Sequence, residues 1–158
     1  MVKVLVIYHS VTGNTEKMAQ FVAEGVKKEG VEVDLKKVEN VKVEELLKYD
    51  GIVIGSPTYY GLPSAPVKKL IDDSVTYHGK LEGKIGGAFS SAAGIGGGTE
   101  TTILAILEAL MVHGMIVQGR SGKYHYGPVS INAPDKKVQE GCIEYGRQIA
   151  RLVSRLFK

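Results

Sequence analysis

Near the start of this sequence, an apolar segment is followed directly by small residues suited to binding an anion: Ser10, Val11, Thr12, Gly13, Asn14 and Thr15. The three hydroxyl groups and the amide are neutral hydrogen-bond donors, and glycine permits a tightly curved backbone. No lysine or arginine occurs in this segment. We therefore expect residues 10–15 to hold a phosphate or similar anion by neutral dipoles.

The flanking segments predict how this loop is positioned. Residues 2–8 form a near-continuous β-branched run, which is typical of a central parallel strand. After the loop, Met18, Val22 and Val26 share one face of a helix that extends to about Lys28. The N-terminus of that helix would direct its free N–H groups and positive dipole end toward an anion.

Other phosphate-binding loops fit the sequence less well. No Gly-Lys-Ser/Thr ending of a Walker loop is present, and the G-x-G-x-x-G fingerprint of dinucleotide-binding domains has only Gly13 at the first turn. Asp50 opens the third predicted strand, whereas a receiver domain would need an acidic residue at the end of that strand. The single cysteine, Cys142, is far from the first loop, which excludes a small cysteine-dependent phosphatase.

Helical and strand patterns alternate along the chain, which predicts an α/β fold with a mostly parallel sheet in one domain, residues 1–158. We expect strands at residues 2–8, 31–35, 51–55, 84–91 and 115–117. We expect helices from the first loop to residue 28 and at residues 43–47, 65–72, 99–113 and 138–156.

Two later loops should meet the first one, because the carboxyl ends of parallel strands share one sheet edge. In the loop after the third strand, Tyr59 and Tyr60 can pack against a flat heterocycle and Thr58 can donate a hydrogen bond. In the loop after the fourth strand, a glycine-rich backbone can approach an aromatic ring closely. A tyrosine that only anchors the core and a glycine loop that is only flexible are the alternative interpretations.

Four motifs sharpen this interpretation: Pro57–Gly61, Phe89-Ser90-Ser91, Gly96–Glu100 and His113-Gly114-Met115. They resemble WrbA-type NAD(P)H:quinone oxidoreductases, an FMN-binding branch of the flavodoxin-like superfamily. The first loop, Ser-Val-Thr-Gly-Asn-Thr, is closer to that of simple flavodoxins. The resemblance implies a three-layer, doubly wound flavodoxin-like fold, with a five-stranded parallel sheet of order 2-1-3-4-5.

The resemblance also implies which residues would contact FMN. The phosphate would lie on Ser10–Thr15, and the isoalloxazine would lie between the two later loops. Those loops contribute Pro57, Thr58, Tyr59, Tyr60, Gly61, Ser91, Ala92, Ala93, Gly94, Ile95, Gly96 and Gly97.

A substrate face can be expected from His113, Tyr77 and Tyr126. His113 matches a histidine that lies near the flavin in the family, although a histidine at a helix C-terminus is also favoured by the helix dipole alone. We assign no catalytic side chain and no metal site, since bound FMN would carry the redox chemistry.

Two functions follow from the resemblance, and a third follows if no flavin is bound. An enzyme would pass hydride from NAD(P)H to FMN and then to a quinone-like acceptor. A flavodoxin-type carrier would move single electrons between redox proteins; classical flavodoxins are acidic, whereas this chain has a net charge of +3. A domain without flavin would serve only as an interaction module.

Composition limits the cellular setting that we expect. The calculated pI near 8.9 is only mildly basic, so we expect no nucleic-acid partner. No apolar run approaches the roughly 20 residues of a membrane span, and no secretory signal is visible. A lone Cys142 fits a reducing cytoplasm. The apolar helix at residues 99–113 is compatible with a homodimer or homotetramer, and Arg147, Arg151 and Arg155 form either a solvated stripe or a dock for an acidic partner.

Overall fold

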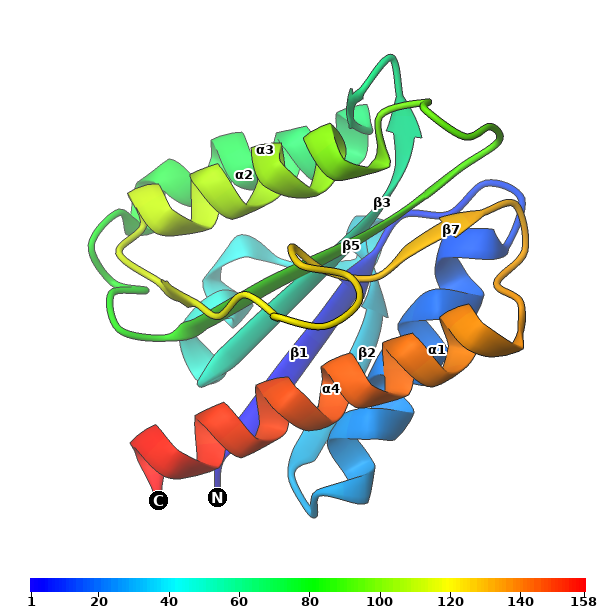
Figure 1. The fold of residues 1–158 in the computed structure, drawn as a ribbon. Helices are drawn as coiled ribbons and strands as arrows, with labels where there is room; N and C mark the ends of the chain where they lie inside the picture. The colour runs from blue at the N-terminus through cyan, green and yellow to red at the C-terminus, as the bar shows by residue number, and fades with distance from the viewer.

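A parallel sheet runs through the centre of the computed structural model, which describes residues 1–158 (Figure 1). The strands β2, β1, β3, β5 and β6 lie side by side in that order, and neighbouring strands are parallel. This topology confirms the predicted order 2-1-3-4-5. The bounds of these strands are Glu32–Lys37, Lys3–Tyr8, Gly51–Tyr59, Ile85–Ala92 and Ile116–Val117.

The fifth position of the sheet is divided between two short strands. β6 pairs with the beginning of β5, and β7 (Val129–Ile131) pairs in parallel with its end. The loop of residues 118–128 connects them. β7 was not predicted, because three residues are too few to display a strand period.

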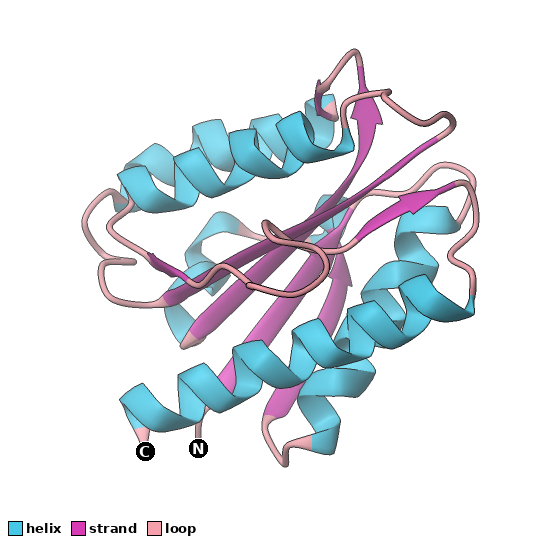
Figure 2. Cartoon of the chain, viewed as in Figure 1, coloured by secondary structure: helices cyan, strands magenta, loops and turns pink.

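Two pairs of helices cover the two faces of the sheet, which gives the expected three layers (Figure 2). α1 (Asn14–Lys28) and α4 (Lys136–Phe157) lie on one face, and α2 (Ala65–Asp73) and α3 (Thr99–Val112) lie on the other. The predicted helix at residues 43–47 is the 3-10 helix η2 (Val43–Lys48). Two further 3-10 helices, η1 (Val38–Asn40) and η3 (Ser74–Tyr77), were not predicted.

The sheet separates two apolar cores, and β1 contributes to both. Val4 and Val6 pack with α1 and α4, whereas Leu5 and Ile7 pack with α2 and α3. Successive side chains of a strand point to opposite faces, so a strand covered on both sides must be apolar throughout. None of the helices combines the length and the apolar character that a membrane-spanning helix requires.

The helices α1 and α4 approach each other closely because each has a glycine at their crossing. A Cβ atom on Gly25 would lie 2.0 Å from the carbonyl oxygen of Ile143, and one on Gly146 would lie 2.0 Å from that of Val22. The two helix backbones are therefore in near contact. Any side chain at either glycine would push α1 and α4 apart.

The contact between α1 and α4 can be tested with Gly25→Ala. Alanine is the better helix former by roughly 0.5–1 kcal/mol, so a free helix surface would gain stability from this change. Here we expect the free energy of unfolding to fall by about 2 kcal/mol in a urea titration, because the methyl group overpacks the crossing. Glu140→Ala on the exposed face of α4 is the control and should change stability by less than about 0.5 kcal/mol. A Gly25→Ala protein as stable as the parent would contradict the packing.

Candidate functional site

A hollow of about 350 Å³ lies where β1, β3 and β5 end. All but one of its lining residues belong to the three loops that the sequence predicts to converge there. The remaining one, Asn132, follows β7. The lining residues are Ser10, Val11, Thr12, Asn14, Thr15, Pro57, Thr58, Tyr59, Ser91, Ala92, Ala93 and Asn132.

The first loop delivers the N-terminus of α1 to this hollow. Gly13 is the N-cap residue and has a positive φ of 94°, which glycine adopts without strain. Its N–H donates to the Ser10 hydroxyl at 3.1 Å, and this bond closes the loop. The N–H groups in the first turn of α1 have no intrahelical acceptor. The N-cap residue is a glycine and has no side chain that could accept from them. These donors can hold an anion in the hollow.

No positively charged side chain lines the hollow. The carboxylate of Glu16, which follows the lining residue Thr15, is hydrogen-bonded to Tyr8. The Tyr8 hydroxyl donates to the Glu16 carboxylate at 2.8 Å. Burial, reinforced by this hydrogen bond, raises the pKa of Tyr8 to about 12, so the phenol stays protonated as the donor. An anion bound here would be held by neutral donors.

Hydroxyl groups connect the three loops below the hollow. The hydroxyls of Thr15 and Ser91 are 2.8 Å apart and join the first loop to the end of β5. Thr58 is 2.9 Å from the Ser90 hydroxyl and also accepts a hydrogen bond from Thr102 of α3 at 3.1 Å. These bonds fix the relative positions of the loops without placing a charge among them.

The second and third loops meet at two glycines. β3 continues to Tyr59, turns through Tyr60 and Gly61 at positive φ, and returns as β4 (Leu62–Pro63). A Cβ atom on Gly98, which has a φ of 103°, would lie 2.5 Å from the Cα atom of Gly61. Only glycine at position 98 permits this close approach. Of the two tyrosines that precede this contact, Tyr59 lines the hollow and Tyr60 is fully exposed.

Several residues of the predicted set belong to these loops without lining the hollow. These are Gly13, Tyr60, Gly61, Gly94, Ile95, Gly96 and Gly97. Asn132, which also lines the hollow, was not predicted. Its backbone N–H donates to the Ala92 carbonyl at 2.8 Å and so ties it to the end of β5. No local signal could have found it, because the three residues of β7 that precede it are too few to display a strand period.

The structure does not bring the three residues expected on a substrate face to this hollow. α3 starts beside it, but its 14 residues span about 21 Å, so His113 lies at the opposite end of the sheet. Tyr77 lies in η3 at that same end, before β5 begins. Tyr126 is half exposed in the loop of residues 118–128 and is not among the lining residues.

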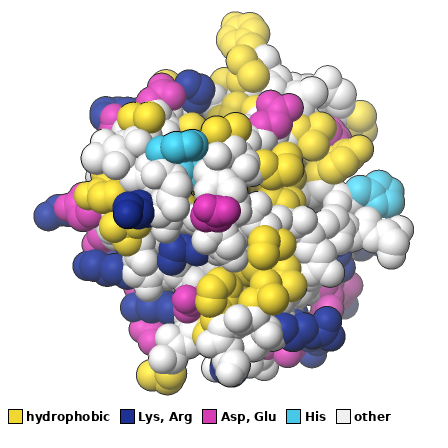
Figure 3. Space-filling model, turned by 90° about the vertical axis from the view of Figure 1, so that its left-hand side faces the viewer, with side chains coloured by type: hydrophobic (Ala, Val, Ile, Leu, Met, Phe, Trp, Pro, Cys, Tyr) yellow, Lys and Arg dark blue, Asp and Glu magenta, His cyan; other side chains and the backbone are white.

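Figure 3 shows the end of the molecule that carries the termini, where acidic, basic and apolar side chains are mixed.

His113 is instead part of an apolar cluster with Leu46, Leu70 and Leu81. The Ser74 hydroxyl donates to the Ile71 carbonyl at 2.6 Å, so His113 Nε2, 2.7 Å away, must donate to Ser74. Nδ1 is then unprotonated, and it is buried without a partner. Burial, with a smaller contribution from His78, lowers the pKa of His113.

Comparison with known proteins places this geometry in a family. The family model described as "Flavodoxin domain" matches residues 5–93, more than half of the chain and from β1 to just beyond β5. The chain belongs to the flavodoxin family. No group of three or more His, Cys, Asp or Glu side chains is arranged so that it could hold a metal ion.

Relatives of this chain include flavodoxins and quinone dehydrogenases. A flavodoxin from Aquifex aeolicus is 43% identical over 163 positions, which cover 98% of this chain and 88% of the relative. An NAD(P)H dehydrogenase (quinone) from Archaeoglobus fulgidus is 34% identical over 191 positions, covering 99% and 100%. The solved structure of a flavodoxin from the domain Archaea superimposes with a TM-score of 0.82 at 30% identity, covering 97% and 99%.

Membership of the flavodoxin family implies FMN as the cofactor, and the hollow fits that group. The uncapped N-terminus of α1 offers free N–H donors for a phosphate. Tyr59 offers an aromatic face, while Ala92 and Ala93 leave room for a flat ring. The residues present therefore suit both ends of the flavin mononucleotide.

The environment of His113 predicts how stability depends on pH. Because its folded-state pKa lies below the ordinary value of 6.5, the unfolded chain binds the proton more readily. The resulting stability is present above pH 6.5 and is lost as the pH falls through the lower folded-state pKa. We expect His113→Gln, whose amide can still donate to Ser74, to flatten the fall in unfolding free energy between about pH 7 and pH 5. Parallel profiles for His113→Gln and the parent would refute this account.

Proposed function

We propose that this protein is an FMN-dependent electron carrier of flavodoxin type, which passes single electrons between redox proteins. The observation that carries the proposal is the length over which this chain aligns with a flavodoxin and with a quinone dehydrogenase. The alignment with the Aquifex flavodoxin has 163 positions, close to the 158 residues of this chain. The alignment with the Archaeoglobus quinone dehydrogenase has 191, so more than thirty positions have no counterpart here.

When bound, FMN supplies the redox chemistry. The chain's own contribution starts with the phosphate, for which Thr12, Asn14 and the first turn of α1 provide neutral donors. This arrangement would fix the phosphate end of the cofactor at the carboxyl ends of the strands. It leaves the charge of the phosphate without a neutralising side chain, so the local field at the hollow stays negative when the phosphate is present.

The other two loops would position the isoalloxazine and leave an edge open. Tyr59 can cover one side of the ring, and backbone groups near Ala92 and Ala93 can donate to its polar edge. Apolar side chains at the tips of the loops, Val11, Tyr60 and Ile95, are strongly exposed. An apolar rim around an open cofactor edge suits brief contact with a partner protein better than enclosure of a small substrate.

An NAD(P)H-dependent reductase of quinones or similar acceptors is the second candidate. It is supported by the 34% identity to the Archaeoglobus quinone dehydrogenase over nearly the whole chain, and by a net charge of +3, which is unlike the acidic carriers. In this case a homodimer or homotetramer would have to complete the substrate site, because His113 and Tyr77 lie far from the hollow of their own chain. The single, fully buried Cys142 supports a cytoplasmic setting for either function.

Anaerobic absorption spectroscopy separates the two candidates. A carrier should keep its flavin oxidised when NADH or NADPH is added, since no nicotinamide site is needed. A ferredoxin-type reductase should reduce it in two separate one-electron stages. Bleaching by either nicotinamide, followed by recovery of colour with a quinone, would contradict the carrier and support the reductase.

Removing neutral donors from the first loop tests the position of the phosphate. The double variant Thr12→Val, Asn14→Ala should bind FMN about tenfold more weakly, at about 0.5–1.5 kcal/mol per hydrogen bond. Riboflavin, which lacks the phosphate, should bind the variant and the parent equally well in fluorescence titrations. Thr76→Val, an exposed site in η3, is the control. An equal loss for FMN and riboflavin would show that these residues do not hold the phosphate.

A further inference from the structure

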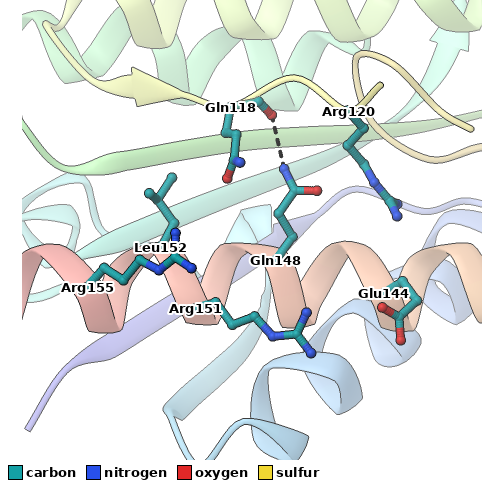
Figure 4. A pocket seen from close by; sticks show the side chains of 7 residues that line it. All are labelled: Gln118, Arg120, Glu144, Gln148, Arg151, Leu152 and Arg155. Atoms are coloured by element: carbon teal, nitrogen blue, oxygen red, sulfur yellow. Dashed lines mark hydrogen bonds between the residues drawn. The ribbon is translucent and has the colours of Figure 1, made fainter. Parts of the chain in front are cut away.

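A second hollow, of about 230 Å³, lies between α4 and the residues that follow β6 (Figure 4). Gln118 and Arg120 come from the loop side, and Gln148, Arg151 and Arg155 come from α4. The amide of Gln148 donates to the Gln118 carbonyl at 3.3 Å and ties the two sides together. No residue is shared with the hollow at the carboxyl ends of the strands.

One carboxylate, Glu144, lines this second hollow, and it is already engaged in an ion pair. Glu144 accepts from Arg147 at 2.9 Å, and Arg147 also contacts Glu29 at 2.6 Å. Arg151 contacts the same Glu29 oxygen at 3.0 Å, which holds its side chain in place. Arg120 and Arg155 form no ion pair with any carboxylate of the chain. Positive charge therefore remains uncompensated on both sides of the hollow.

Arg120 also has an unsatisfied hydrogen-bond donor. Its Nη1 atom is buried from solvent and has no hydrogen-bond partner within the chain. A buried donor that makes no hydrogen bond is costly, and more so when it carries charge. The backbone around it is well fixed, because the Arg120 N–H donates to the His125 carbonyl at 3.1 Å and the His125 ring lies 2.8 Å from the Arg120 carbonyl. Arg120 therefore lines the hollow from an ordered segment.

We propose that this hollow is a binding site for a small diphosphate-bearing anion. Guanidinium groups bind phosphate oxygens through paired hydrogen bonds, and a diphosphate has two charged centres for the two unpaired arginines on opposite sides. Leu152 is the one apolar residue of the lining, so an apolar ligand would find little to contact. The site is separate from the FMN hollow, and the inference does not depend on the electron-carrier function.

The test is calorimetric titration of sodium pyrophosphate into the purified protein at constant ionic strength. We expect one saturable site, with the same affinity in the presence of excess FMN. Arg120→Gln and Arg155→Gln should each weaken binding about tenfold, as expected for loss of a charge-assisted hydrogen-bonding group. Lys137→Gln removes the same charge from an exposed position near the start of α4 and should leave the affinity unchanged.

Several results would overturn the proposal. These are binding that does not saturate, competition by FMN, an equal loss with Lys137→Gln, or equal affinity for inorganic phosphate or citrate. Arg155 is exposed near the end of α4, so Arg155→Gln keeps the test valid if Arg120→Gln does not fold. If pyrophosphate does not bind, the results expected from the flavin titrations do not change. The diphosphate site and the electron-carrier function are therefore tested independently.

Discussion

The parallel register of β3 with its two neighbours is the constraint on which the candidate site depends. Tyr8 of β1 lies opposite Gly55, and Pro57 lies opposite Ser91 of β5. The loops that follow these positions must therefore leave the sheet at one edge. Gly55 helps to fix this register, because a Cβ atom there would lie 2.1 Å from the ring of Phe89. A slip by one residue would turn the buried side chains of β3 to the wrong faces and separate the loops.

Charge is distributed in a way that keeps the two hollows chemically distinct. The hollow at the strand ends is lined by hydroxyls, an amide and helix N–H groups, with no cationic side chain. The hollow along α4 contains three arginines, two of them without a carboxylate partner. A phosphate at the first hollow would keep a negative field there, whereas a phosphate at the second would be neutralised by the arginines. The same anion chemistry can therefore serve a cofactor in one place and a separate ligand in the other.

The alternation of strands and helices was enough to predict a parallel sheet and the meeting of three loops at one edge, whereas the strand order 2-1-3-4-5 came from the family resemblance. It was not enough for Asn132, which depends on a three-residue strand after a long loop. His113 was expected near the flavin from a motif match, but the length of α3 places it at the other end of the sheet. The unpaired Arg120 depends on how the loop of residues 118–128 folds back, which no local pattern in the sequence encodes.

The most direct test of the central claim is an NMR titration of the 15N-labelled protein, freed of flavin, with FMN. The account predicts that the largest amide shifts fall on residues 10–15, 57–61 and 91–97, with a smaller effect at Asn132 after β7. Amides around Arg120 and along the second half of α4 should stay unchanged. Shifts centred on Arg120 and Arg155 with none in the first loop would contradict the account, because they would place the phosphate at the cationic hollow.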